Sequence, residues 1–200
     1  MEERSRKAVW EVLWQQRKRI YHYANILEIA EEVSDGIDGK KVLEIGCGRG
    51  STLLEFAKRG ANVKGIDYAQ SAIALCNNLK EKASTNGNGN HLSAEFLQAD
   101  AQDLPFGNEE FDIVYSVGLL EHFQDPTQIL AEQWRVLKTG GFVIVQVPQR
   151  YSIYTIAKKL LMGIGKWPYG GWETQYSEKE LRTNVEKTRL SPMFSYGYGS

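Results

Sequence analysis

The residues best suited to chemistry lie in a short glycine-rich segment of the chain. An apolar run, residues 41–45, precedes a helical pattern that begins near Ser51. Between them lie three glycines at alternate positions: Gly46, Gly48 and Gly50. Glycine permits sharp turns and lets a ligand touch the backbone, and a helix N-terminus offers unpaired N–H groups. The segment therefore predicts a loop that binds a nucleotide cofactor.

Three acidic residues at the ends of apolar segments indicate which cofactor this is. The dinucleotide pattern would need a glycine at Ser51, and Glu44 would repel a pyrophosphate but attract an ammonium group. Asp67 ends the second apolar segment and could accept both hydroxyls of a ribose. Asp100 ends the third and could accept a hydrogen bond from an adenine amino group. Together the three acids describe S-adenosylmethionine.

At these residues the chain resembles the class I S-adenosylmethionine-dependent methyltransferases. Within that class it is similar to the small-molecule methyltransferases that include those of quinone biosynthesis. Residues 111–123 and 134–141 extend the likeness, which covers roughly residues 40–148. The resemblance implies a Rossmann-like fold, S-adenosylmethionine as cofactor, S-adenosylhomocysteine as product and no metal.

The resemblance also assigns residues to the cofactor site. We expect Tyr68 along the adenosine, the Ala101 backbone N–H at the adenine ring, and the Val117 backbone near the methionine part. Asp103 lies close to Asp100 in sequence and could compete with it. The expected set is Glu44, Gly46, Gly48, Gly50, Asp67, Tyr68, Asp100, Ala101 and Val117.

A base is the one catalytic group that some acceptors would need, because the cofactor already carries an activated leaving group. His122 follows the expected fourth strand, beside the position of the transferred methyl group, and is the candidate base. A structural or substrate-shaping role is the alternative for this histidine. The neighbouring Glu121 is expected to be a solvated or helix-capping acid.

Composition limits the class of protein. With 200 residues, of which 42% are hydrophobic and 24% charged, the chain fits one globular domain. A net charge of -1 argues against nucleic-acid binding through bulk electrostatics. Cys47 and Cys76 give neither a disulfide framework nor metal-ligand spacing, and both are expected to stay reduced. No stretch approaches the length of a membrane span or the pattern of a signal peptide, which favours a cytoplasmic protein.

Strands and helices are predicted to alternate, which implies an α/β fold. It would be a doubly wound, mostly parallel Rossmann-like sheet with helices on both faces and a site at the carboxyl ends of the strands. The apolar run 142–147 predicts a strand covered on both faces. Asp125 and Pro126 predict the start of a helix, and the polar segment 84–90 predicts a mobile surface loop. The expected strands are 41–45, 63–67, 95–98, 111–117 and 142–147, and the expected helices are 51–59, 71–82, 126–137 and 178–186.

The domain organisation follows from the change of pattern on either side of this core. Residues 1–38 are predicted as a helical extension or lid, and residues 39–200 as the methyltransferase domain. Within that domain the aromatic-rich segment 149–176 is a candidate substrate-lid insertion. It could instead be a helix packed on the core, or a basic face that touches a membrane surface. Residues 190–198 offer one final strand where the resembling family has two, so truncation, a dispensable strand or a partner's strand all remain open.

Three functional hypotheses remain. The first is methylation of a small molecule, and the aromatic segment makes an apolar one an option. The second is a methyltransferase that acts on a macromolecule. Against it stand the near-neutral charge and Ser116–Leu119, because related families that methylate amino nitrogens often carry Asn-Pro-Pro-Tyr there. The third is a non-catalytic module that binds S-adenosylmethionine. The sequence leaves the acceptor and the oligomeric state open.

Overall fold

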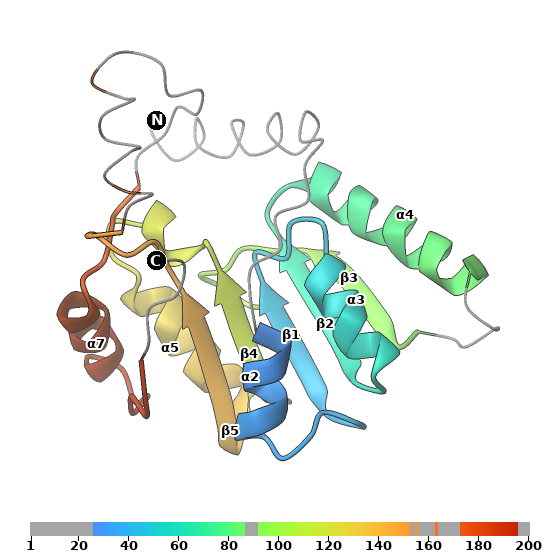
Figure 1. Cartoon of the computed structure of the whole chain (residues 1–200), viewed down its shortest axis with the longest axis horizontal. Coiled ribbons are helices and arrows are strands. Elements are labelled where there is room, and N and C mark those ends of the chain that lie inside the picture. The colour runs from blue at the N-terminus through green and yellow to red at the C-terminus, as the bar shows by residue number, and fades with distance from the viewer. Residues whose placement is uncertain (1–25, 87–91, 153–154, 156–162, 164–172, 196–200) are drawn as a thin grey trace.

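The strands form one parallel sheet (Figure 1). The computed structural model describes residues 26–86, 92–152, 155, 163 and 173–195. Its sheet has five strands in the order β3-β2-β1-β4-β5, and all four neighbouring pairs are parallel. This confirms the predicted Rossmann-like sheet. The strands are β1 (Lys41–Ile45), β2 (Asn62–Asp67), β3 (Ala94–Gln98), β4 (Phe111–Val117) and β5 (Leu137–Gln146).

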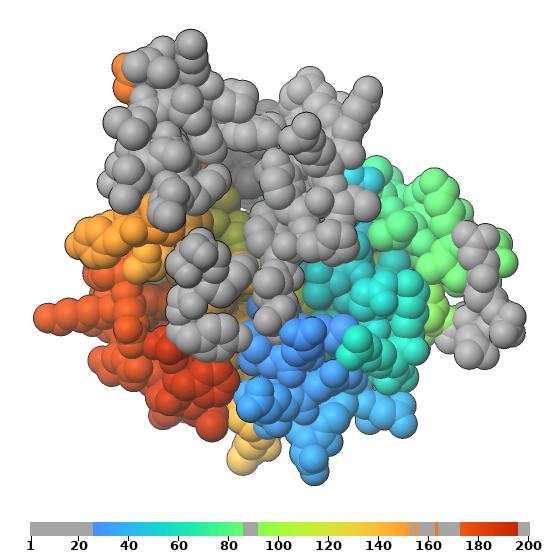
Figure 2. Space-filling view, in the orientation of Figure 1, coloured from blue at the N-terminus to red at the C-terminus, as the bar shows by residue number. Residues whose placement is uncertain are grey.

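Helices cover both faces of the sheet. On one face, α2, α3 and α4 contribute to a single apolar cluster, and Figure 2 shows α2 and α3 next to each other on the surface of that face. On the other face, α5 and α7 pack together over a second cluster. The helices are α2 (Ile26–Val33), α3 (Ser51–Lys58), α4 (Gln70–Asn86), α5 (Thr127–Val136), α7 (Glu178–Glu186) and the short 3-10 helix η1 (Leu120–His122).

The central strand β1 explains why the sheet needs both layers. Val42 belongs to the first apolar cluster, while Leu43 and Ile45 belong to the second, and all three are fully buried. Alternate side chains of a strand point to opposite faces, so β1 is apolar on both. The sheet order reverses direction between β1 and β4, and doubly wound folds bind ligands at the carboxyl ends of the strands beside such a point.

Two predicted helix boundaries were wrong. Helix α4 continues to Asn86 instead of ending at 82, so the first part of the polar segment 84–90 is helical. Helix α5 begins one residue later than its predicted cap implied, with Pro126 rather than Asp125 at the N-cap. Asp125 Oδ1 still accepts a hydrogen bond from the Thr127 N–H at 3.0 Å, which is a turn contact of the kind that aspartate favours.

The predicted strand 142–147 is formed as the last part of β5, which begins earlier, at Leu137, and both of its faces pack on the core as predicted, with α2 on one side and α5 on the other. Strand β5 lies at an edge of the sheet, and Phe142, Val143 and Ile144 are only partly buried. Within the described chain β5 pairs with β4 alone, so its other side has no strand beside it. The final strand expected within 190–198 is not formed by residues 190–195.

Several predictions fall largely outside the described residues. Of the N-terminal extension 1–38, residues 26–33 form helix α2, whose buried Ile26 and Ala30 lie one helical turn apart. Most of the candidate lid 149–176, including its lysines, lies outside the described ranges. Among the helices that the structure does describe, none has both the length and the apolar character that crossing a bilayer requires.

Candidate functional site

The loop that joins β1 to α3 depends on glycine. Gly46, Gly48 and Gly50 have φ angles of 75, 54 and 68 degrees, in the left-handed region that glycine adopts without strain. At Gly50 the space is also closed. A Cβ atom there would lie 2.8 Å from Phe96 Cε1 and 2.9 Å from Cys76 Sγ. The sequence pattern therefore found a loop in which conformation and packing both require glycine.

Strand β2 holds this loop in place. The backbone N–H groups of Gly46 and Cys47 both donate to the Ile66 carbonyl, at 2.9 and 2.8 Å. One residue further on, the Gly48 N–H donates to Asp67 Oδ2 at 2.9 Å. The loop therefore lies against the carboxyl end of β2, where Asp67 is. Two of the predicted cofactor-binding features, distant in sequence, meet in the structure.

Asp67 is buried, with 8% of its surface exposed. Its second oxygen, Oδ1, accepts a hydrogen bond from the Ala69 N–H at 2.9 Å. Each carboxylate oxygen can accept more than one hydrogen bond, so these backbone contacts orient the group without exhausting it. A ribose with two neighbouring hydroxyls is a ligand that such an oriented carboxylate can bind.

Glu44 lies one strand away, in an unusual environment for an acid. It is 7% exposed, and its buried Oε2 atom has no hydrogen-bond partner within the described part of the chain. The pKa of the carboxyl is raised to about 8, mainly by burial and also by the charge of Asp67, while the Tyr115 hydroxyl acts to lower it. An ammonium group would compensate the cost of ionising this carboxyl, as the sequence interpretation requires.

The third acid lies at the end of β3, beside β2. The Ala99 N–H donates to the Asp67 carbonyl at 3.0 Å, so the exits of the two strands are in contact. Asp100 Oδ1 accepts from the Gln102 N–H at 3.0 Å, and the Asp103 N–H donates to the Asp100 carbonyl at 3.2 Å. Asp103 is therefore part of the same turn as Asp100.

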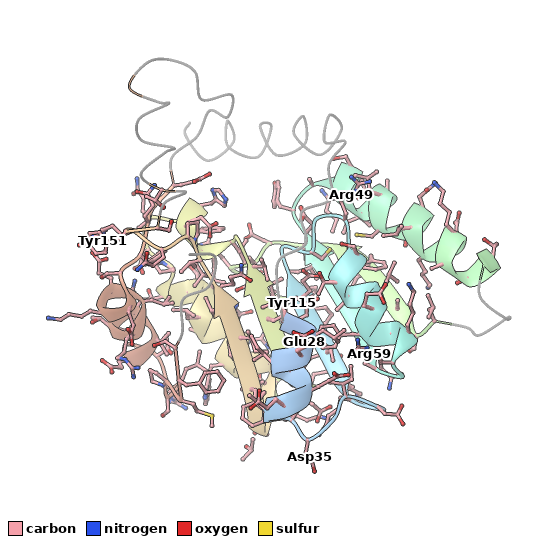
Figure 3. The ribbon with its side chains drawn as sticks, in the orientation of Figure 1. Glu28, Asp35, Arg49, Arg59, Tyr115 and Tyr151 are labelled. Atoms are coloured by element: carbon pink, nitrogen blue, oxygen red, sulfur yellow. The ribbon has the colours of Figure 1, made fainter. Side chains whose placement is uncertain are left out.

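The remaining cofactor-site candidates lie at the same end of the strands. Tyr68 follows β2, is 39% exposed, and accepts a hydrogen bond at its carbonyl from Gln98 Nε2 at 2.9 Å. Ala101 is buried beyond β3, and Val117 is the last residue of β4. Figure 3 shows that Arg49, from the glycine loop, also lies at the end of the molecule toward which β1 and β2 point.

His122 closes the short helix η1, which directly follows β4. Its side chain is 19% exposed, and its Nε2 atom lies 4.0 Å from Glu121 Oε1. Glu121 itself is buried, with 3% of its surface exposed, so the expectation of a solvated acid was wrong. The Thr174 N–H donates to the Glu121 carbonyl at 2.8 Å, so the chain near Thr174 lies against η1.

Tyr176 is a residue of this region that sequence reasoning did not assign. It is 4% exposed, and its hydroxyl donates to the Leu120 carbonyl at 3.2 Å. Its backbone N–H donates to the Pro148 carbonyl at 3.1 Å, just after β5. Tyr176 thereby ties together the exits of β4 and β5. Nothing local in the sequence distinguishes it from the other aromatic residues of its segment.

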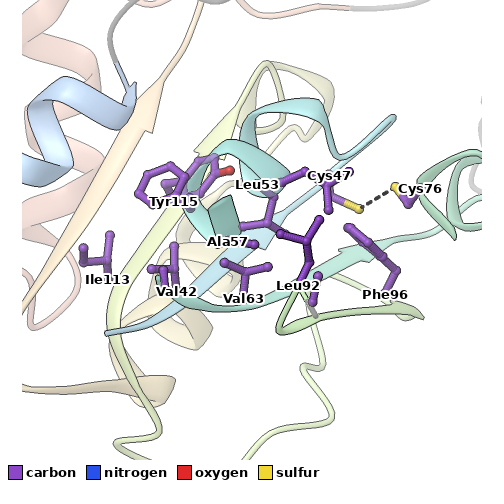
Figure 4. Packing of buried hydrophobic residues seen from close by; sticks show 14 of the residues in the cluster. Val42, Cys47, Leu53, Ala57, Val63, Cys76, Leu92, Phe96, Ile113 and Tyr115 are labelled. Carbon is purple, nitrogen blue, oxygen red and sulfur yellow. Dashed lines mark hydrogen bonds between the residues drawn. The ribbon is translucent and has the colours of Figure 1, made fainter. Parts of the chain in front are cut away.

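The two cysteines also meet, which their sequence spacing did not indicate. Cys47 Sγ and Cys76 Sγ are 3.8 Å apart and both residues are buried as free thiols (Figure 4). The Cys76 thiol also donates to the Gly48 carbonyl at 3.3 Å. Helix α4 therefore supports the glycine loop from one side while β2 supports it from the other.

A parallel sheet in this order, with a glycine loop anchored on an acid of the next strand, defines a class of nucleotide-binding fold. The family model described as "Methyltransferase domain" matches residues 43–145, which is more than half of the chain. The chain belongs to this family, the class I S-adenosylmethionine-dependent methyltransferases.

Curated relatives and solved structures agree with this assignment. The chain is 33% identical over 131 residues to the ubiquinone biosynthesis O-methyltransferase of Pseudomonas fluorescens, covering 64% of this chain and 54% of that protein. The chain thus spans about half the length of such relatives. Geranyl diphosphate C-methyltransferase from Streptomyces coelicolor, solved with S-adenosylhomocysteine, shares the fold with a TM-score of 0.71 at 14% identity, over 94% of this chain and 80% of that one. A methyltransferase from Methanosarcina mazei matches with a TM-score of 0.58 at 27% identity, over 75% and 79%.

Proposed function

We propose that this protein transfers a methyl group from S-adenosylmethionine to a small-molecule acceptor by in-line displacement. The observation that carries the proposal is the joining of the glycine loop to Asp67, with the unpartnered, buried Oε2 atom of Glu44 beside them. An oriented acid and a buried acid without a counter-charge, both next to a glycine loop, suit a ligand with a ribose and an ammonium group. The names of the relatives support a small-molecule acceptor.

The residues present fit this cofactor, which supplies a methyl group activated on a sulfonium when bound. Glu44 would hold its ammonium group, Asp67 its ribose hydroxyls, and the loop backbone its methionine part. Asp100 or the neighbouring Asp103 would accept from the adenine amino group. Holding the methyl group in line with the acceptor, and keeping water out, is the main contribution a protein makes to this reaction.

His122 is proposed as the group that takes the proton from the acceptor. It follows β4 at the carboxyl edge of the sheet and remains partly exposed, so an acceptor can reach its ring. The Glu121 carboxylate 4.0 Å away would stabilise the imidazolium that forms. For an acceptor that needs no base, the same side chain would shape the acceptor site.

The segment that precedes Glu173 is proposed as the wall or lid of the acceptor site, and the part of residues 1–38 that comes before helix α2 as a second covering element. Support comes from where the described part of the chain resumes. Thr174 and Tyr176 bind the backbone of η1, next to His122. The described chain therefore resumes beside η1, which is where the acceptor would lie.

The test is methyl transfer from cofactor that carries a labelled methyl group. Purified protein is incubated with small phenols and polyprenylated phenols, and separately with protein and RNA fractions. Label in a small organic product supports the proposal, and label only in protein or RNA overturns it. Calorimetric binding of S-adenosylhomocysteine without transfer to any acceptor would favour the non-catalytic module. His122→Ala serves as the matched variant, and we expect it to bind S-adenosylhomocysteine normally while transferring the methyl group more slowly.

A further inference from the structure

Two buried oxygen atoms on neighbouring strands find no hydrogen-bond partner among the residues that the structure describes. They are Glu44 Oε2 on β1 and the hydroxyl oxygen of Tyr115 on β4. Glu44 and Tyr115 are register partners in the parallel β1–β4 pair, so their side chains leave the sheet on the same face. A buried polar group without a partner costs about 1–3 kcal/mol. Two such groups side by side suggest an interaction that forms in another state of the protein.

The position of the Tyr115 hydroxyl is fixed by packing. Tyr115 is fully buried, and its ring stacks on Phe56 of α3 with centroids 5.5 Å apart and planes 22 degrees from parallel. Figure 4 shows the hydroxyl oxygen on the side of the ring nearest Leu53 and the Cys47 loop. A ring held in this way cannot swing its hydroxyl to a distant partner. The hydroxyl therefore stays beneath the glycine loop.

The surroundings of Glu44 can be named element by element. Strand β2 presents Asp67, whose charge raises the pKa of Glu44, and β4 presents the Tyr115 hydroxyl, which lowers it. Cys47 of the loop and Cys76 of α4 are close enough to act on Tyr115. On the same face of the sheet, helices α2 and α3 contribute apolar side chains to the first cluster, namely Ile26, Ala30, Leu53, Phe56 and Ala57.

Tyr115 and Glu44 are close, yet they do not meet the geometry of a formed hydrogen bond. A carboxylate accepts a stronger hydrogen bond than a neutral carboxyl does. A positively charged ligand group would favour the carboxylate, and the hydroxyl beside it would then gain an acceptor. The same step would satisfy both buried oxygens.

We propose that Tyr115 is a positioning residue for the cofactor, whose hydroxyl donates to Glu44 and holds its carboxylate toward the ammonium group. The inference rests on the proposed cofactor role of Glu44. Tyr115 itself touches no cofactor in this scheme and acts only through Glu44. This role explains why a tyrosine, rather than an apolar residue, occupies a position in β4 that is otherwise surrounded by apolar side chains.

A purely structural tyrosine would behave differently on replacement by phenylalanine. Tyr115→Phe keeps the ring that stacks on Phe56 and removes a hydroxyl that has no partner. Removing an unsatisfied buried donor is neutral or stabilising. We therefore expect the variant to unfold at the same temperature as the native protein or higher, and yet to bind the cofactor product more weakly.

The experiment measures S-adenosylhomocysteine binding by calorimetry for the native protein, Tyr115→Phe, Glu44→Gln and the double variant. We expect Tyr115→Phe to weaken binding about 3- to 10-fold at neutral pH. The ratio of the native affinity to that of Tyr115→Phe should fall toward one as pH rises, because alkaline conditions ionise Glu44 without help from the hydroxyl. Both proteins meet the same ligand, so the ligand's own titration cancels in the ratio. In the Glu44→Gln background the second change should add nothing.

Methylthioadenosine is the control ligand because it lacks the amino-acid part. Its affinity should be the same for the native protein and Tyr115→Phe. An equal loss of affinity for both ligands in Tyr115→Phe would overturn the inference. So would native affinity of Tyr115→Phe for S-adenosylhomocysteine if Glu44→Gln binds it more weakly. Unchanged binding by Glu44→Gln would instead remove the role of Glu44 and the inference with it. Failure of the native protein to bind S-adenosylhomocysteine would reject the proposed function itself.

Discussion

Asp67 accepts a hydrogen bond from the backbone N–H of Gly48 at 2.9 Å, which joins the end of β2 to the loop after β1. Its other oxygen accepts from Ala69 at 2.9 Å, at the start of the next helix. One carboxylate thus orients two backbone segments. A residue expected only to hold a ribose also organises the loop that would bind the rest of the cofactor.

Replacing Asp67 with alanine should therefore weaken S-adenosylhomocysteine binding by about 1–3 kcal/mol, because the ribose hydroxyls lose a charged acceptor and the loop loses its anchor. Calorimetry measures the affinity, and Asp67→Asn, which keeps one acceptor oxygen, should fall between alanine and the native protein. Glu81→Ala removes the same charge from an exposed position on α4 and should bind normally. Affinity of Asp67→Ala equal to that of the native protein would contradict the assignment.

Gly50→Ala should destabilise the protein more than Gly36→Ala does. Both glycines have positive φ angles, 68 and 91 degrees, so both substitutions strain the backbone by about 1 kcal/mol. Only at Gly50 would the new Cβ also collide, with Phe96 and Cys76, whereas nothing lies within 4 Å of it at Gly36. Thermal unfolding measures the difference. Equal melting temperatures for the two variants would show that the packing around the loop is not closed.

The features that could be predicted from the sequence are those with local causes. The glycine loop is fixed by conformation at each glycine, and the helix predicted over 178–186 begins at Glu178 behind a capping box in which Ser177 Oγ accepts from the Glu180 N–H. The strand ends that carry Asp67 and Asp100 follow from short apolar runs. Such signals lie within a few residues of the structure that they determine.

The features that were missed depend on which strands become neighbours. The meeting of Glu44 with Tyr115 requires the register of β1 against β4, and that of Cys47 with Cys76 requires the packing of α4 beneath the loop. The partial exposure of β5 follows from its place at the sheet edge. An apolar run indicates that a strand is buried somewhere, but not how many neighbours it has.

Glu44 should make the stability of the protein depend on pH. Burial raises the pKa of its carboxyl from an ordinary value of 4.5 to about 8, so between these values the folded protein binds more protons than the unfolded chain. The stabilising contribution of the protonated carboxyl is fully present below about pH 4.5 and is lost as pH rises through about 8. Glu44→Gln is neutral throughout and should become more stable than the native protein as pH rises.

The size of this effect at about pH 8 should be on the order of a few kcal/mol in the free energy of unfolding, and it should shrink toward acid pH. Denaturant unfolding at a series of pH values measures it. Glu81→Gln, an exposed carboxyl on α4, is the control and should show no growing difference. If the difference in free energy of unfolding between Glu44→Gln and the native protein stays constant with pH, then folding does not raise the pKa of Glu44.

Tyr176→Phe should lower methyl transfer while leaving S-adenosylhomocysteine affinity unchanged, because it removes the hydrogen bond to the Leu120 carbonyl and loosens the helix that carries His122. The expected loss of stability is about 1 kcal/mol. Ser177→Ala is the matched control, since it removes the neighbouring capping box at a similar cost but leaves the Leu120 contact in place. If both variants lose methyl transfer equally, general stability explains the effect; a loss confined to Tyr176→Phe assigns it to the positioning of His122.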